Sequence, residues 1–155
     1  MTDKNQTSSA TRIIDAAAKD IFDILSNPAR HPETDSSGMV ESVDQGERLK
    51  EIGDTFTMNM KNANGEYQTK NEVFAIQEDR IIGWKTLGNI TSDVPTGPKW
   101  LYELEPVDAD HTTVKLTYQR DEIESDKILG LSEKFNDELM EKSLDALAAA
   151  VAGAE

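Results

Sequence analysis

Apolar and polar residues alternate with two different periods along the chain. Between residues 39 and 118 the alternation is every second position, as in the TFTMNMK segment at 55–61, which is typical of strands with one buried face. From Leu131 to Val151 apolar residues recur every three to five positions. This second pattern predicts one long amphipathic helix that ends at Gly153.

The first forty residues follow neither pattern for long. Residues 1–9 are polar, and we expect them to form a disordered tail. Arg12–Asp15 is a candidate strand and Ala17–Leu25 a candidate helix. Pro28 ends that helix, because the residue before a proline disfavours helical backbone, and one more short helical turn is expected over residues 28–33.

Turn signals divide the middle of the chain into strands. The NANG sequence at 62–65 predicts a tight hairpin, and the segment from Gly88 to Pro98 reads as a polar loop. A strand, a helix, about six antiparallel strands and a long final helix indicate a single α+β domain over residues 10–153. An antiparallel sheet with one apolar face needs a cover, and the C-terminal helix is long enough to provide it.

Composition excludes several classes of function. Thirty acidic residues oppose sixteen basic ones, for a net charge of −14, and such a surface repels nucleic acids. The absence of cysteine excludes thiolate chemistry and fits a cytoplasmic protein. No apolar run approaches the roughly 20 residues of a membrane span. We therefore expect no nucleic-acid partner, no membrane insertion, and a monomer or weak dimer.

Six segments, taken in order and spacing, carry a resemblance to a known family. They are AAAKDIFDILSNPARHPETDSSGMV, GDTFTMNM, Tyr67 with Asn71-Glu72-Val73, IIGWK, WLYELEP with DADHTTV, and SLDALAAAVA. From Arg12 to Ala152 the chain resembles the polyketide cyclase/dehydrase-like branch of the START and birch-pollen-allergen superfamily, also called SRPBCC or helix-grip proteins.

The resemblance implies a helix-grip fold. In that fold a curved antiparallel sheet of about six to seven strands wraps around a long C-terminal helix, and two short helices follow the first strand. It also implies an elongated cavity between sheet and helix that holds hydrophobic or amphipathic molecules such as polyketides or lipids. A minority of such proteins catalyse cyclisation, dehydration or hydrolysis, and no cofactor is implied.

The period of two assigns a set of residues to the inner face of the sheet or to the covering helix. This set is mostly apolar and aromatic with few polar groups, which is the composition of small-molecule pockets. The same residues could equally form a filled core. The predicted ligand-contacting residues are Phe56, Met58, Met60, Tyr67, Asn71, Trp84, Trp100, Tyr102, Tyr118, Phe135 and Leu139.

The segment NPARHPETDSSGMV, residues 27–40, should cross near one end of this cavity. A histidine ordinarily titrates near neutral pH, so His31 could act as an acid or base. Asp35 could orient it, and both residues are predicted to contact the ligand. Ser36 and Ser37 could donate to a ligand carbonyl. Alternatively, His31 packs a helical turn and Asp35 closes an Asx-turn.

Other chemistry has weaker support. No G-x-S-x-G elbow occurs, His31 and His111 lie too far apart in sequence to indicate a zinc site, and the DEIESD run at 121–126 lacks calcium-loop spacing. We therefore expect no metal. Lys85 and Arg120 are the basic residues placed near strand ends, where they could steer an acidic ligand or act as surface charges.

The sequence thus favours binding of a polyketide- or lipid-like molecule in an internal cavity. One alternative is a polyketide cyclase or dehydratase that uses the same pocket, with His31 or Asn71 as the candidates for proton transfer. The other alternative is a module that binds a protein partner and assists chaperones.

Overall fold

One antiparallel sheet forms the body of the protein in a computed structural model that describes residues 4–35 and 37–153. The strand order is β1-β8-β7-β5-β4-β3-β2, and β6 pairs with β5. The strands are β1 Thr7–Ile14, β2 Val40–Gln45, β3 Thr55–Asn62, β4 Gly65–Gln77, β5 Ile81–Asn89, β6 Val94–Pro95, β7 Lys99–Asp108 and β8 His111–Gln119. The helices are α1 Ala18–Leu25, η1 Pro28–Arg30, α2 His31–Thr34, α3 Asp126–Leu131, η2 Ser132–Lys134 and α4 Asp137–Gly153.

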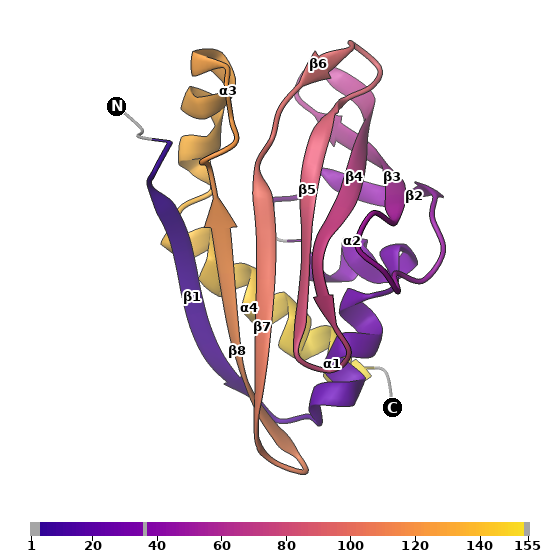
Figure 1. Ribbon diagram of the computed structural model, residues 1–155, viewed down its shortest axis with the longest axis vertical. Helices are drawn as coiled ribbons and strands as arrows, with labels where there is room; N and C mark the ends of the chain where they lie inside the picture. Colours follow the sequence, from indigo (N-terminus) through magenta and orange to yellow (C-terminus); the bar gives the residue numbers. More distant parts are fainter. Residues whose placement is uncertain (1–3, 36, 154–155) are drawn as a thin grey trace.

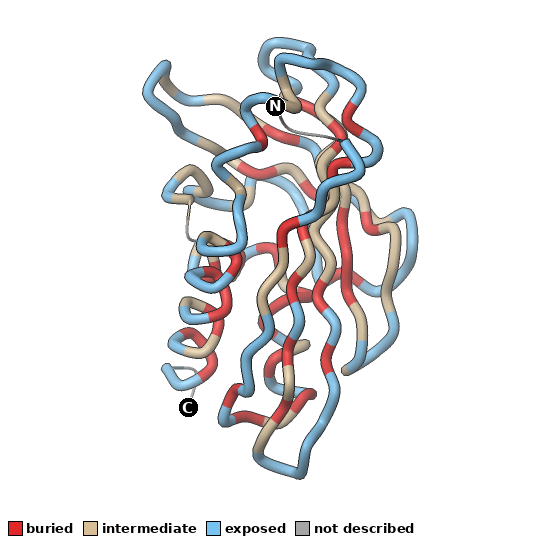
Figure 2. Tube along the Cα trace, turned by 90° about the vertical axis from the view of Figure 1, so that its left-hand side faces the viewer, coloured by how far each residue is buried: buried red, intermediate tan, exposed pale blue. Residues whose placement is uncertain are grey.

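The helices cover one face of this sheet (Figure 1). Helix α4 packs on β1 and β8 and against α1 and α2. Its buried residues lie on the side that faces the sheet, as Figure 2 shows. Helix α3 stands apart, beyond the end of β8. This is the α+β helix-grip fold that the sequence predicts, with two short helices after the first strand.

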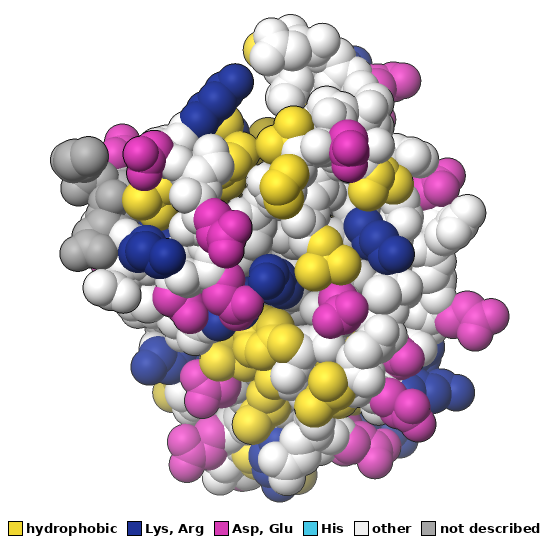
Figure 3. Space-filling model, turned by 45° about the horizontal axis from the view of Figure 1, so that its top comes forward, with side chains coloured by type: hydrophobic (Ala, Val, Ile, Leu, Met, Phe, Trp, Pro, Cys, Tyr) yellow, Lys and Arg dark blue, Asp and Glu magenta, His cyan; other side chains and the backbone are white. Residues whose placement is uncertain are grey.

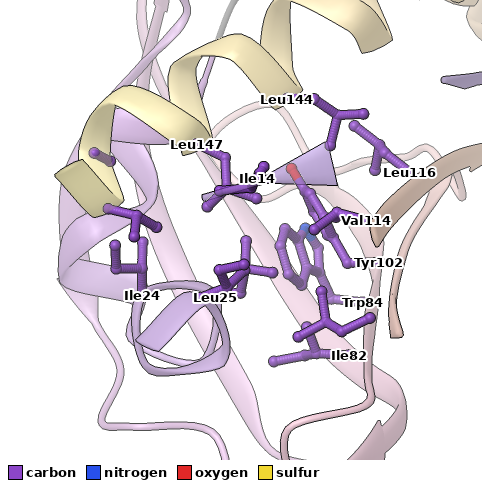
Figure 4. Close-up of a cluster of buried hydrophobic side chains, with 14 of the residues drawn as sticks. Ile14, Ile24, Leu25, Ile82, Trp84, Tyr102, Val114, Leu116, Leu144 and Leu147 are labelled. Carbon is purple, nitrogen blue, oxygen red and sulfur yellow. The ribbon is translucent and has the colours of Figure 1, made fainter. Parts of the chain in front are cut away.

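The core lies between α4, α1 and the lower half of the sheet. Ile82, Val114 and Leu116 from the strands meet Leu144 and Leu147 from α4, and all are almost fully buried (Figure 4). Every second residue of β8 is buried, from Thr112 to Tyr118, which matches the alternation in the sequence.

The first strand is longer than the sequence indicates. β1 begins at Thr7 and pairs with β8 from Thr7 opposite Gln119 to Ile14 opposite Thr112. Residues 7–9, which we expected in a disordered tail, are therefore part of the sheet. Their polar side chains gave no strand signal, but backbone hydrogen bonds to β8 do not require apolar side chains. The sheet also gains β6, a two-residue strand inside the expected 88–98 loop.

The predicted C-terminal helix is broken into two. Phe135 leaves helical geometry with φ −85° and ψ 67°, and α4 begins only at Asp137. The Asn136 side chain accepts a hydrogen bond from the Leu139 N–H at 3.0 Å, which caps the new helix. The break separates α3 from α4 and places α3 where it can border a space above the core.

Arg120 fixes this break and is neither a surface charge nor a steering group. Its side chain is 1% exposed and lies 4.9 Å from the centre of the Tyr118 ring. Its guanidinium donates to the carbonyls of Ser132 and Phe135 at 2.9 and 2.8 Å, to the Ser132 and Ser8 hydroxyls at 2.9 and 3.0 Å, and to the Gln6 carbonyl at 3.2 Å. Arg120 therefore ties β1, β8 and the η2 turn together.

Lys85, the second residue expected to steer a ligand, follows the inward-facing Trp84 and points to the other face of the sheet. Its ammonium group pairs with Glu122 at 2.9 Å, and Lys99 pairs with the same carboxylate at 2.8 Å. Hydrogen bonds from Lys99, which has the larger effect, and from Lys85 lower the pKa of Glu122 to about 2. These ion pairs anchor the segment that leads from β8 to α3.

Candidate ligand-binding cavity

A cavity of about 910 Å³ lies between the upper half of the sheet and the helices. Its walls are inward-facing side chains of β3, β4, β5, β7 and β8, together with α2 and Ser143 of α4. Its rim comes from the β3–β4 hairpin, the loop that carries β6, and helix α3. Figure 3 shows exposed hydrophobic side chains between charged ones at this end of the molecule.

All but one of the predicted ligand-contacting residues line the cavity. Leu139 is not part of the wall and instead packs, half-buried, against the core. Ser143, one turn further along α4, does line the cavity. The predicted residues that line it are His31, Asp35, Phe56, Met58, Met60, Tyr67, Asn71, Trp84, Trp100, Tyr102, Tyr118 and Phe135.

Two aromatic clusters shape the walls. In the first, the His31 ring stacks on Trp84 at 4.6 Å between centroids and meets the edge of Phe56 at 5.2 Å, while Tyr102 lies 5.7 Å from Trp84. In the second, Phe135 stacks on Tyr118 at 5.1 Å, and Trp100 meets both rings edge-on. Since stacked rings restrict one another, these walls are largely preformed.

His31 is a buried, uncharged part of the first cluster. It is the first residue of α2, is 6% exposed, and its Nε2 lies 2.8 Å from the Leu25 carbonyl oxygen. A carbonyl can only accept, so Nε2 carries the proton and donates it there. Burial lowers the pKa of His31 to about 4. At neutral pH the ring is therefore neutral and a weak base.

Asp35 holds the loop that follows α2. One carboxylate oxygen accepts from the Ser37 N–H and hydroxyl at 3.0 and 2.7 Å, and the other accepts from the N–H groups of Gly38 and Val40 at 2.9 and 3.2 Å. Gly38 takes a φ of +77°, which favours glycine. Both oxygens of Asp35 are thus engaged inside the loop. Ser36 lies outside the described residues.

Several polar atoms open onto the cavity without a protein partner. Among the described residues, the hydroxyls of Tyr102 and Tyr118 and the indole N–H groups of Trp84 and Trp100 make no hydrogen bond to protein, yet no fully enclosed side-chain polar atom there lacks a partner. These atoms must therefore reach open space. Figure 4 shows the Tyr102 hydroxyl pointing from the sheet toward α4. Burial raises the pKa of both tyrosines, so they stay protonated.

Asn71 adds a directional polar group to the wall. It is 4% exposed, and its Oδ1 accepts a hydrogen bond from the Thr86 hydroxyl at 2.8 Å. This bond orients the amide so that its N–H₂ group is the part left for a guest. Thr86 was missed in the sequence, although it continues the inward alternation that begins at Ile82 and Trp84.

The rim residues Met39, Lys127, Ile128 and Lys134 were also missed. The positions of Lys127, Ile128 and Lys134 depend on where the α3–η2 segment packs, which no local sequence pattern indicates.

The described residues contain no group of three or more His, Asp or Glu side chains that could hold a metal ion. His111 begins β8 after an exposed turn. Its Nδ1 lies 2.8 Å from an Asp108 carboxylate oxygen, and this hydrogen bond raises the pKa of His111. Among the residues that the structure describes, no helix is both long enough and apolar enough to span a membrane.

Comparison with known proteins agrees with this geometry. Residues 5–152 match the model of a family described as polyketide cyclase / dehydrase and lipid transport. The chain belongs to this family. Over 103 residues it is 27% identical to an uncharacterized protein of Mycobacterium tuberculosis. That match takes in 66% of this chain but only 42% of the mycobacterial protein.

Solved structures share the fold at low sequence identity. A protein from Arthrobacter aurescens has a TM-score of 0.74 at 14% identity, covering 99% of this chain and 91% of its own. The Zhui aromatase/cyclase from Streptomyces sp. R1128 has a TM-score of 0.69 at 12% identity, covering 95% and 93%. The major latex-like protein 151 from Panax ginseng has a TM-score of 0.58 at 12% identity, covering 93% and 95%. At these identities the likeness concerns the fold alone.

Proposed function

We propose that this protein binds a hydrophobic or amphipathic small molecule, of polyketide or lipid type, in the cavity between the sheet and α4. The observation that carries the proposal is the set of unpartnered hydroxyl and indole groups on an otherwise apolar wall. A filled core would leave such groups unsatisfied, at a cost of about 1–3 kcal/mol each. A guest molecule or water in the cavity supplies their partners.

Affinity would come mainly from apolar contact. A guest that buries about 300 Å² of apolar surface gains roughly 7.5 kcal/mol at about 25 cal/mol per Å², before the costs of association. Met58 and Met60 contribute flexible side chains to the wall, which suits guests of different shapes. The Asn71 amide would orient the guest by donating to a carbonyl or ether oxygen.

Binding is a better reading of the site than turnover. A cyclase or dehydratase needs a group that takes or gives a proton near neutral pH. The pKa of His31 is about 4, and its Nε2–H is held by the Leu25 carbonyl. Asn71 does not titrate. The wall therefore favours a small-molecule carrier or receptor over an enzyme, and an internal cavity favours a small molecule over a protein partner.

Tryptophan fluorescence tests this proposal. The chain has two tryptophans, Trp84 and Trp100, and both line the cavity. Titration with the neutral apolar dye N-phenyl-1-naphthylamine should quench their emission by energy transfer, in a saturable way, with a Kd in the micromolar range. The affinity should fall in Ser143→Leu, whose larger side chain projects into the cavity from α4. It should be unchanged in Ala149→Leu, an exposed position of the same helix.

Two results would overturn the proposal. One is no saturable energy transfer in the unmodified protein. The other is equal binding by Ser143→Leu and Ala149→Leu when circular dichroism shows both variants folded, because the dye would then sit elsewhere.

A further inference from the structure

Two lysines border the cavity on the same side of its rim. Lys127 lies on α3 and Lys134 on η2, and both line the opening while being exposed to solvent. Within the described part of the chain, neither has a carboxylate within ion-pair distance, whereas Lys85, Lys99 and Lys142 each pair with an acidic side chain. Other surface lysines such as Lys70 and Lys115 are equally unpaired, but among the described residues Lys127 and Lys134 are the unpaired lysines that line the cavity.

The Lys134 ammonium is directed over the cavity. Its Nζ lies 3.6 Å from Met39 Sδ and 5.5 Å from the centre of the Phe135 ring, and both of those residues line the cavity. The Tyr67 hydroxyl reaches the same sulfur at 3.8 Å from the opposite side, on β4. A thioether is a weak acceptor, so these contacts leave the ammonium available to a stronger one.

The acidic residues of the wall do not cancel this charge. Asp35 has both carboxylate oxygens occupied by four donors of its own loop. The other acidic residue that lines the cavity is Glu66, which lies in the β3–β4 hairpin, whereas both lysines belong to the α3–η2 segment. Glu124, Asp126 and Glu133 lie in or beside the same segment but do not line the cavity, so the charged side chains that border it on the α3 side are both positive.

We propose that the ligand is an amphipathic anion, of the chemical class of a long-chain carboxylate. Its apolar body occupies the cavity and its anionic head lies between Lys127 and Lys134. This inference rests on the proposed function. It adds the charge of the ligand and names the residues that bind its charged group. Lys127 and Lys134 would then hold the steering role that was expected of Lys85 and Arg120.

A matched pair of ligands tests the proposal. Dodecanoate and dodecanol have the same chain length and differ in charge at about pH 7.5, where the fatty acid is ionised. Each is titrated against the protein loaded with N-phenyl-1-naphthylamine, and displacement gives its Kd. Two exposed lysine–carboxylate contacts should make dodecanoate bind about tenfold more tightly. Raising the ionic strength from about 0.02 M to about 0.5 M should shrink that preference.

Two double variants with the same change in net charge separate the effect of the rim lysines from the effect of the protein's overall charge. Lys127→Gln/Lys134→Gln should lose the preference for dodecanoate and keep the affinity for dodecanol. Lys70→Gln/Lys115→Gln, at exposed positions on the outer face of β4 and β8, should keep the preference.

The outcomes distinguish the two proposals. If dodecanol displaces the dye and dodecanoate binds no better, or if both double variants retain the preference, the assignment of an anionic ligand is wrong and the cavity proposal stands. If neither compound binds and the dye does not bind, both proposals fail.

Discussion

Protonation of His31 should destabilise the protein by a predictable amount. The pKa of His31 is about 4 in the folded protein, because burial disfavours the imidazolium, and about 6.5 in an unfolded chain. The unfolded state therefore binds the proton more tightly. The contribution of His31 to stability is complete above about pH 6.5 and is lost as the pH falls toward 4. At pH 5 the loss is about 2 kcal/mol relative to pH 7.5.

Urea unfolding at pH 7.5 and pH 5 measures this contribution. His31→Phe is the matched variant, because phenylalanine keeps a ring against Trp84 but does not titrate. Protonation of carboxylates and of His111 affects both proteins alike and cancels in the comparison. The unmodified protein should lose about 2 kcal/mol more than the variant between the two pH values.

Equal pH dependence in the two proteins would refute the reasoning. So would an NMR titration in which the His31 ring shows a pKa near 6.5, since that value would mean that the ring is hydrated and not stacked inside the wall.

Three further substitutions test how the cavity is framed. Asp35→Asn should lower the free energy of unfolding by about 1–3 kcal/mol, measured by urea denaturation, because an amide cannot accept from four donors; unchanged stability would mean that the loop does not depend on this carboxylate. Arg120→Met should cost about 2–4 kcal/mol and speed hydrogen exchange in the η2 turn, where carbonyls lose their donor; exchange that stays slow would count against the anchoring role. Gly97→Ala should cost about 1–3 kcal/mol, because φ is +106° and the new Cβ would meet the Glu122 carbonyl oxygen at 2.6 Å. Its control, Gly130→Ala, meets nothing within 4 Å in α3 and should leave stability unchanged or slightly raised, so equal losses in the two variants would contradict the steric argument.

The inner face of the sheet was predictable because a strand has a strict period of two. Phe56, Met58, Tyr102 and Tyr118 needed only that period to be placed correctly, and the structure puts each of them on the wall. The prediction that they contact a ligand remains to be tested by the titrations above.

The errors share a different physical origin. The break at Phe135 is followed by the capping amide of Asn136, a local signal that the apolar periodicity masked. Arg120 is buried because two distant segments, residues 6–8 and 132–135, supply hydrogen-bond acceptors for it, and the sequence around Arg120 does not indicate these partners. The rim lysines depend on the placement of α3, which is equally non-local.

Methyl NMR locates a guest most directly. The chain has five methionines, of which Met39, Met58 and Met60 line the cavity, while Met140 is fully buried in the core and outside the wall. With ¹³C-methyl methionine, saturating N-phenyl-1-naphthylamine should give nuclear Overhauser contacts to the methyl groups of Met58 and Met60 and none to that of Met140. Contacts confined to Met140, or none to any methionine while the dye is bound, would contradict a guest held between the sheet and α4.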